Sequence, residues 1–448
     1  MVEYTQNVNK RVMYMKIKTV KKSYDEVAKI SPIKHEKPPR PSFLFRTLVR
    51  VLSIFDLMKV KFKWTGRLPK KENGPSLILM NHSSFLDLKI AHKILYPRKF
   101  AIVCAHDALV GKRWLMRRLG CVPTKKFVSD LALIHDISDL LSRGISVLMY
   151  PEAGYSLDGT TTVLPSRLGG FVKMLGVPVT YIETRGAFGY QPLYNELRIR
   201  RTQVTAHVSE LISKEETQTL DAETLMKRIS TAFSFDAFKN QSENRLKITE
   251  PTRAIGLEKI LYRCPHCQTD GTTVSTGARI ICTKCDSKYQ LNEYGELVYE
   301  GEGEGKFRFV SDWFEWQRKC VREEILADKY NADIPVSLYI LKDYKAFYEV
   351  GVGMLKHTPE GFHLIGCEGK VDFTQKALST YGLNVDLYFY EIGDVVSIGN
   401  HDTLYYLFPK NSFPVVKLRL ATEELYKLHH DRDFHLKYCG NCDHSHHD

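Results

Sequence analysis

Two Cys-x-x-Cys pairs constrain the fold of this chain more than any other feature of its sequence. Cys264 and Cys267 form the first pair, Cys282 and Cys285 the second, and fourteen residues separate the pairs. Each pair is a tight knuckle whose sulfurs can share one ion, and the residues between them are enough for a hairpin. The spacing therefore predicts a zinc ribbon over 258–300. Because all four ligands are Cys, no position is left for water, and we expect a structural Zn²⁺.

The length and the charge distribution of the chain predict other domains on both sides of the ribbon. At 448 residues the chain exceeds one ordinary core, so two to four domains are expected. Residues 1–72 hold 18 Lys and Arg against six acids, an excess of 12 that equals the net charge of the whole chain. Residues 1–41, which end in Pro-Pro-Arg-Pro, predict a basic flexible arm. Such an arm suits an anionic lipid surface or nucleic acid, or it is a solvated tail.

The sequence predicts a reducing, cytoplasmic location. Its first twenty residues contain no apolar core of a secretory signal. No apolar run reaches the roughly 18 residues that a spanning helix needs. In that compartment paired Cys bind metal more readily than each other. The tail at 436–448 contains Cys439, Cys442 and three His, which are either a second metal site or a disordered end.

Residues 42–250 predict an α/β domain. Its first segment, Ser42–Lys59, mixes apolar residues with Arg and is too short and charged to span a bilayer. It can lie in a membrane interface with its Arg stems extended to lipid phosphates, or pack on its own domain. Strands are expected at 76–80, 100–105, 146–150 and 178–182, and helices near 84–96, 111–119, 129–142 and 166–175. This alternation indicates a mainly parallel sheet.

Residues 306–435 predict a β-rich domain after a Gly-rich linker at 301–305. A helix near 311–328 precedes about seven or eight β-leaning runs, the last at Val415–Leu420, and a helix at Ala421–His430 ends the series. This order resembles a pleckstrin-homology-like sandwich in its pattern alone.

His82 and Asp87 are the candidate catalytic residues. They lie five residues apart, directly after the apolar run Ser76–Met80. A turn from strand to helix places both at the carboxyl edge of a sheet, where α/β enzymes bind substrates. The carboxylate can fix one imidazole nitrogen, which leaves the other as a general base. The alternative is a surface His at a helix start, because this spacing also occurs by chance.

Three further blocks follow in order. They are Gly120–Lys126, Pro151–Ser156 and Gly176–Val179. With Asn81–Asp87 they resemble the glycerolipid acyltransferase family, which includes the 1-acyl-glycerol-3-phosphate acyltransferases. The resemblance covers about residues 75–185, a quarter of the chain.

The resemblance implies an O-acyltransferase with His82 as base and Asp87 as the residue that orients it. The acyl donor is then acyl-CoA or acyl carrier protein, and the acceptor a lysophospholipid such as 1-acyl-glycerol-3-phosphate at the inner face of the membrane. The implied substrate-binding residues are Asn81, Lys126, Glu152, Gly154, Ser156 and Arg167.

One departure concerns the acceptor phosphate. The family's third block usually reads Pro-Glu-Gly-Thr-Arg-Ser, and here Tyr155 stands where the Arg is expected. A bidentate phosphate contact is therefore missing, and Lys126 in place of Arg offers only a point charge. Either Arg167 or Lys125 supplies the lost charge, or the acceptor is not a simple phosphomonoester.

Two other functions remain open on the sequence. One is a non-catalytic, membrane-associated adaptor with a degenerate acyltransferase domain, which the Tyr at position 155 supports. The other is a nucleic-acid binder that uses the arm and the ribbon. The ribbon argues against the second, because residues 264–298 hold three basic residues against four acids.

Overall fold

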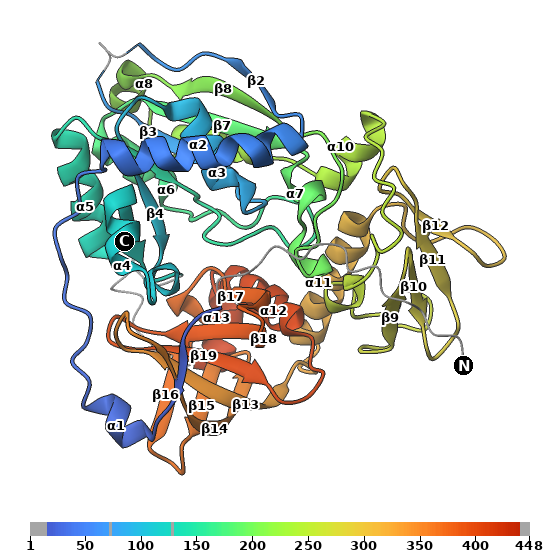
Figure 1. Ribbon diagram of the computed structural model, residues 1–448. Coiled ribbons are helices and arrows are strands. Elements are labelled where there is room, and N and C mark those ends of the chain that lie inside the picture. Colours follow the sequence, from blue (N-terminus) through green and yellow to red (C-terminus); the bar gives the residue numbers. More distant parts are fainter. Residues whose placement is uncertain (1–15, 71–73, 127–129, 440–448) are drawn as a thin grey trace.

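The computed structural model describes residues 16–70, 74–126 and 130–439, without the side chains of Leu436 and Cys439. Three regions are visible: an α/β domain, a small ribbon beside it, and a β-rich domain that faces both (Figure 1). The first residue of the helix expected near 129–142 and residues 440–448 of the Cys/His tail lie outside the described residues.

The α/β domain is built on a seven-stranded sheet with the order β2-β8-β7-β3-β6-β4-β5. Its strands are β2 (Lys63–Gly66), β3 (Leu77–Met80), β4 (Phe100–Ala105), β5 (Cys121–Thr124), β6 (Ser146–Met149), β7 (Val179–Arg185) and β8 (Thr205–Ile212). The four predicted strands are all present. The sheet is mixed, because β8 runs antiparallel to β7 while the other neighbouring pairs are parallel.

Helices cover both faces of this sheet. They are α2 (Phe43–Lys59), α3 (Leu86–Leu95), α4 (Arg113–Leu119), α5 (Leu131–Ser142), α6 (Leu168–Leu175), α7 (Ala187–Tyr190), α8 (Lys214–Thr219), α9 (Ala222–Phe233) and α10 (Ala237–Glu243). Leu77 and Leu79 of β3 point into one core, whereas Ile78 and Met80 point into the other. The strand is therefore apolar throughout, as expected where both faces are buried. Asp130 caps α5 by accepting from the Leu133 N–H at 3.0 Å.

The ribbon is a four-stranded antiparallel sheet with the order β12-β11-β10-β9. Its strands are β9 (Thr273–Thr276), β10 (Arg279–Cys282), β11 (Lys288–Leu291) and β12 (Leu297–Tyr299). One cysteine pair precedes β9, and the other begins at Cys282, the last residue of β10, as the predicted hairpin requires. Tyr289 of β11 packs on Trp313 of the next domain, with ring centroids 5.3 Å apart. The ribbon is thus joined to the rest of the molecule through a shared core.

The β-rich domain begins with α11 (Val310–Leu326) and continues as an antiparallel sheet with the order β16-β15-β14-β13-β19-β18-β17. Its strands are β13 (Ala332–Leu341), β14 (Phe347–Thr358), β15 (Gly361–Gly366), β16 (Val371–Lys376), β17 (Asn384–Phe389), β18 (Gly393–Gly399) and β19 (Leu404–Pro409). The β-rich composition is as predicted. The likeness to a pleckstrin-homology sandwich stays a prediction.

The end of this domain differs from the prediction. Val415–Leu420, expected as a strand, is the first half of α12 (Val415–Leu428), and α13 (Arg432–Cys439) follows it. Most side chains of α12 are buried, on more than one face of the helix. The alternation of Val416, Leu418 and Leu420 with Lys417 and Arg419 is typical of a strand, which explains the wrong assignment.

Part of the arm predicted to be flexible is ordered against the β-rich domain. Strand β1 (Thr19–Lys21) pairs in parallel with β14 at Phe347–Glu349, and α1 (Tyr24–Ala28) follows with a capping box. Strand β15 pairs with β14 only from Gly353 onward, so the edge at Phe347–Glu349 is available to β1. Residues 19–28 thus contain a strand and a helix where a flexible arm was predicted, because an unpaired strand edge is available to pair with the arm.

The β-rich domain covers the carboxyl edge of the α/β sheet. The short helix η2 (His106–Leu109) directly follows β4, and its Asp107 accepts a hydrogen bond from the Tyr390 hydroxyl at 3.2 Å. The Tyr344 hydroxyl and His106 Nδ1 lie 2.9 Å apart, and Val110 packs among aromatic residues of the β-rich domain. The two domains therefore meet where the candidate catalytic residues lie.

Candidate active site

His82 and Asp87 are in direct contact. His82 lies in the turn after β3, and Asp87 is the second residue of α3. Their Nδ1 and Oδ2 atoms are 3.0 Å apart. The His82 side chain keeps 18% of its surface exposed, whereas that of Asp87 keeps 1%. The predicted pair is thus formed, and its imidazole remains partly accessible.

The backbone of the turn fixes the Asp87 carboxylate. Its Oδ2 also accepts from the N–H groups of Ser83 and Ser84, at 2.8 and 3.0 Å. A carboxylate that accepts two backbone bonds acts as an acceptor for His82 as well, so Nδ1 carries the proton. The basic lone pair is then on Nε2, as a general base requires.

Burial lowers the pKa of His82 below its ordinary value of 6.5. The hydrogen bond and the charge of Asp87 oppose this shift, while the positive charge of Lys126 adds to it. The imidazole is therefore neutral at neutral pH. A neutral imidazole can accept a proton from a hydroxyl group.

Glu152 ties the His82 turn to the loop after β6. Its Oε2 accepts from the His82 N–H at 2.7 Å, and its Oε1 accepts from the Thr162 N–H at 3.1 Å. Burial raises the pKa of Glu152 to about 7, although these bonds and the charge of Arg419 oppose it. Both carboxylate oxygens are engaged with backbone groups. Glu152 therefore acts on the site by positioning His82.

Asn81 and Ser156 also support the loops. Asn81 is buried and pairs with Thr184 on β7, accepting from its N–H at 2.7 Å and donating to its carbonyl at 3.0 Å. Ser156 donates its N–H to the His82 carbonyl at 3.1 Å, and its hydroxyl donates to the Thr160 carbonyl. Asn81 and Ser156 thus support the loops around His82, and their contact with substrate stays a prediction. Beside Gly154 the space is open.

Two tyrosines flank the catalytic imidazole. Tyr150 stacks on His82 with ring centroids 4.1 Å apart, and Tyr155 stacks on it at 3.9 Å. Two rings cannot share one face at these distances, so the imidazole lies between them. Access to His82 is then along the edge of its ring. The sequence singled out Tyr155 for a missing charge but gave no role to Tyr150.

The cation whose charge acts on His82 is neither Arg167 nor Lys125, the two residues expected to replace the missing Arg. Lys126 is close enough for its charge to act on His82. Lys125 instead lines a separate cavity of about 260 Å³ with Arg113 and Arg117, and His82 is not among the residues that line it. Arg167 is exposed just before α6. Lys126 is therefore the predicted cation that the structure brings to the catalytic pair.

Two charged residues of the β-rich domain act on the site and were not predicted. Arg419 of α12 is buried, and its charge lowers the pKa of both Glu152 and Asp158 against the effect of burial. Burial raises the pKa of Asp386 on β17 to about 7, and the charge of Lys126 opposes this rise. Neither residue belongs to a local motif, so no spacing in the sequence points to them.

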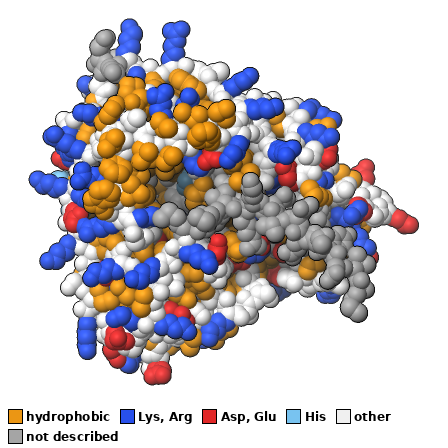
Figure 2. Space-filling view, viewed as in Figure 1, with side chains coloured by type: hydrophobic (Ala, Val, Ile, Leu, Met, Phe, Trp, Pro, Cys, Tyr) orange, Lys and Arg blue, Asp and Glu red, His pale blue; other side chains and the backbone are white. Residues whose placement is uncertain are grey.

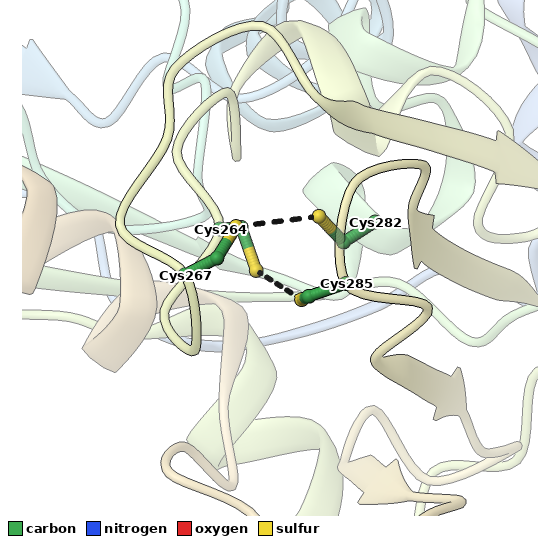
Figure 3. A group of neighbouring side chains, drawn as sticks. All are labelled: Cys264, Cys267, Cys282 and Cys285. Carbon is green, nitrogen blue, oxygen red and sulfur yellow. Dashed lines mark hydrogen bonds between the residues drawn. The ribbon is translucent and has the colours of Figure 1, made fainter.

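The four cysteines of the ribbon converge on one point (Figure 3). All four sulfurs lie within 4.8 Å of one another, and the closest pairs, Cys264 with Cys285 and Cys267 with Cys282, are 3.6 Å apart. Four thiolates 2.3 Å from a tetrahedral Zn²⁺ are about 3.8 Å apart. The donor set and its spacing therefore fit zinc. His266 is a neighbour, with its Nε2 3.0 Å from the Tyr289 hydroxyl.

Comparisons with known proteins match the segment of the chain that carries this site. Residues 60–181 match the model of the acyltransferase family. A chloroplastic 1-acyl-sn-glycerol-3-phosphate acyltransferase from Brassica napus is 28% identical over 154 residues, which cover 32% of this chain and 42% of the relative. Another from Arabidopsis thaliana is 29% identical over 124 residues, which cover 27% of this chain and 33% of the relative. The chain thus spans less than half the length of these curated relatives.

Among solved structures, the 1-acyl-sn-glycerophosphate acyltransferase PlsC from Thermotoga maritima is similar at 15% identity. The similar part covers 42% of this chain and 76% of that chain, with a TM-score of 0.35.

Proposed function

We propose that this chain, whose residues 60–181 belong to the acyltransferase family, transfers a fatty acyl group from a thioester carrier to the hydroxyl of a lysophospholipid. The observation that carries the proposal is the 3.0 Å contact between His82 Nδ1 and the buried Asp87 carboxylate. This contact prepares Nε2 as a base at the partly exposed edge of the ring.

In the proposed reaction His82 Nε2 takes the proton of the acceptor hydroxyl. The hydroxyl oxygen attacks the thioester carbonyl, an ester bond forms, and the carbon–sulfur bond breaks. The proton held by His82 then passes to the departing thiolate. A positioned base of this kind contributes roughly 10²–10⁴-fold to the rate. Asp87 stabilises the imidazolium that forms between the two proton transfers.

The acceptor we propose is 1-acyl-glycerol-3-phosphate or a related lysophospholipid. The relatives in plants carry that activity in their names, and Lys126 supplies a positive charge beside His82. The donor is acyl-CoA or acyl carrier protein, which present the same thioester. The chemistry at His82 is the same for both.

We further propose that α2 lies against the inner face of a membrane. Leu44, Leu48, Leu52 and Phe55 of this helix are each at least about half exposed, at spacings of four, four and three residues. Figure 2 shows apolar side chains gathered over α2 with Lys and Arg around them. Arg46 of α2 does not belong to this basic border, because its side chain is buried and donates to the Arg98 carbonyl. An apolar stripe with a basic border suits the surface of anionic lipids. Within the described residues, no helix has the length and apolar character that spanning a bilayer requires.

The four-cysteine cluster is proposed to hold a structural Zn²⁺. The metal would fix the two knuckles of the ribbon, and its closed set of four thiolates leaves no position for substrate. The ribbon shares a core with α11, so the zinc would also stabilise the contact between domains.

A second candidate function is a non-catalytic adaptor. The observation that favours it is Tyr155, which replaces the expected Arg and covers one face of the imidazole at 3.9 Å. A protein of this kind would bind lipid vesicles without turning over thioester.

The test offers the purified chain a labelled acyl-CoA with a panel of lysophospholipids that differ in headgroup. Diacyl products are then identified by mass spectrometry. We expect product with the wild type and with His207→Gln, a control at an exposed His of β8, but a loss of about 10²–10⁴-fold with His82→Gln. Vesicle binding without product from any acceptor would support the adaptor instead.

A further inference from the structure

Two adjacent cavities lie where the arm, the α/β domain and the β-rich domain meet. Their volumes are about 260 and 830 Å³, and the residues that line both are Ile33, Lys34, Glu36, Arg113 and Tyr344. The arm contributes the first three of these from the segment that connects α1, beside the β-rich domain, with α2 on the α/β domain (Figure 1). His82 is not among the described residues that line either cavity. The cavities are therefore separate from the catalytic pair.

Four lysines that line one or both cavities form no ion pair with a carboxylate among the described residues. They are Lys18, Lys34, Lys125 and Lys345. Burial lowers the pKa of Lys125, and the charges of Asp130 and Asp402 oppose this shift without cancelling it. The protein therefore only partly compensates the charge of Lys125.

The acids of the cavities do not neutralise these lysines, because each already contacts another group. Six Lys and Arg line the two cavities with four Asp and Glu. The acids pair as follows: Glu36 with Arg113 and Arg117, Asp136 with His35, Asp130 with the Leu133 N–H, and Asp343 with the Tyr348 hydroxyl. The charge left over is positive, and it favours a ligand with several negative charges.

Tyr344 adds a flat surface where the two cavities adjoin. Its ring is within 7° of parallel to the ring of His106, and the guanidinium carbon of Arg113 lies 5.3 Å from its centroid. Aromatic rings and guanidinium groups pack on the faces of nucleotide bases. Together with the lysines, these planar groups suit a nucleotide that carries several phosphates.

The cavities lie near the same edge of the sheet as His82 but some distance along it. His82 follows β3, whereas His106 and Lys125 follow β4 and β5. The order β3-β6-β4-β5 places the ends of β4 and β5 two and three strands from β3, roughly 10 and 14 Å away. In 1-acyl-glycerol-3-phosphate the phosphate is on the carbon next to the one that bears the reacting hydroxyl. That phosphate cannot reach the cavities while the hydroxyl is at His82, so their ligand must be tethered farther from the reacting atoms.

We propose that these cavities bind the 3′-phosphoadenosine diphosphate end of acyl-CoA, an inference that rests on the proposed acyl transfer. The pantetheine arm of CoA is about as long as four extended residues, roughly 14 Å. This length matches the span along the sheet edge, so the thioester can reach His82 while the phosphates contact the lysines. Lys34 comes from the arm and Lys345 from the β-rich domain. These two regions would thus favour CoA over acyl carrier protein, which lacks the nucleotide.

The test measures the binding of adenosine 3′,5′-bisphosphate, which carries no thioester, to the full chain by isothermal titration calorimetry. We expect Lys125→Gln and Lys34→Gln each to raise the Kd about tenfold, because each removes a charged contact to phosphate. Lys125→Arg keeps the charge and should bind within about threefold of the wild type. Lys227→Gln, at an exposed lysine of α9, is the matched control and should leave the Kd unchanged.

Kinetics separate this site from the proposed reaction. In the wild type, the KM for acyl-CoA should be at least about tenfold below that for the same acyl group on phosphopantetheine, and Lys125→Gln should narrow this difference with little change in kcat. An equal Kd for the bisphosphate in the wild type and in Lys125→Gln would overturn the site, even if the chain transfers acyl groups. Nucleotide binding that Lys125→Gln weakens, in a chain that acylates no acceptor, would support the site and contradict the proposed function instead.

Discussion

The ribbon and the candidate active site are both signalled by short motifs, but they depend differently on the rest of the molecule. All four ribbon cysteines come from 22 consecutive residues, Cys264–Cys285, and one hairpin brings them together. The active site combines a local pair, His82 and Asp87, with Glu152, Tyr150 and Tyr155 from the loop after β6. Charges of Asp386 and Arg419 reach it from another domain. A local motif therefore specifies the ribbon, whereas it specifies only the centre of the active site.

The largest expected effect tests the local character of the ribbon. Cys264→Ser should remove the ribbon zinc and with it several kcal/mol of local stability, because binding and folding are coupled in such sites. Hydrogen exchange should then show lost protection in β9–β12, while the β3 and β6 amides keep theirs. Cys320→Ser, at a half-buried cysteine outside the cluster, is the matched control. Equal loss of protection throughout the α/β sheet would show that the ribbon is not a local unit.

The pH dependence of turnover tests the environment of the active site. Burial lowers the pKa of His82 below 6.5, so the base is neutral above that pH and becomes protonated only below it. We expect the titration of His82 to leave kcat/KM unchanged from pH 6.5 upward. Once the pH is below the His82 pKa, kcat/KM should fall about tenfold per pH unit. An acid limb with a midpoint above 6.5 would contradict the buried environment.

Asp386→Asn tests whether the β-rich domain acts on the acceptor. Because the pKa of Asp386 is raised to about 7, it is neutral below that pH and negative above it, where it weakens the field of Lys126. The KM for a phosphomonoester acceptor should therefore rise from pH 6 to 8 in the wild type. In the variant we expect a KM lower by roughly 2- to 5-fold at pH 8, about 0.5 to 1 kcal/mol for a partly screened charge.

The control for this measurement is Asp372→Asn, at an exposed carboxylate that pairs with His363. It should reproduce the wild-type profile of KM against pH. If Asp386→Asn also follows that profile, the two domains are independent in acceptor binding.

The smallest expected effect is in the loop that carries Glu152. Ala153 has φ +53°, in the left-handed region that favours glycine, and it stands where the family motif has Gly. Ala153→Gly should stabilise the chain by about 0.5 to 1 kcal/mol, since it relieves the Cβ strain. The urea midpoint of unfolding measures this. Ala232→Gly in α9 is the control, and it should lower the urea midpoint because it costs roughly 1 kcal/mol of stability. A destabilising effect of Ala153→Gly would show that the loop is unstrained.

The sequence predicted the parts of the molecule in which chemistry and spacing are local. It located the strands and helices around His82, the contact of His82 with Asp87, and the ribbon cysteines. It also predicted that Asn81 and Ser156 bind substrate, but a motif alone does not show which neighbouring strand or loop a polar side chain contacts. Asn81 is in fact paired with Thr184, 103 residues away.

The unpredicted features depend on pairing between distant segments. Strand β1 is ordered by an edge of β14 more than 300 residues later in the chain. The first half of α12 alternates apolar residues with Lys417 and Arg419, so its sequence resembles a strand. Asp386 and Arg419 act on the site only after the β-rich domain has packed over the sheet edge. Such contacts leave no periodic pattern or fixed spacing in the sequence.

The most direct test of the central claim is a double-mutant cycle on acyl transfer with His82→Gln, Asp87→Asn and both together. If the carboxylate acts through the imidazole, each single change lowers kcat by about 10²-fold or more, and the double variant is no slower than His82→Gln alone. Losses that multiply would show that Asp87 acts independently of His82. Activity of His82→Gln within about threefold of the wild type would contradict the assignment of His82 as the base.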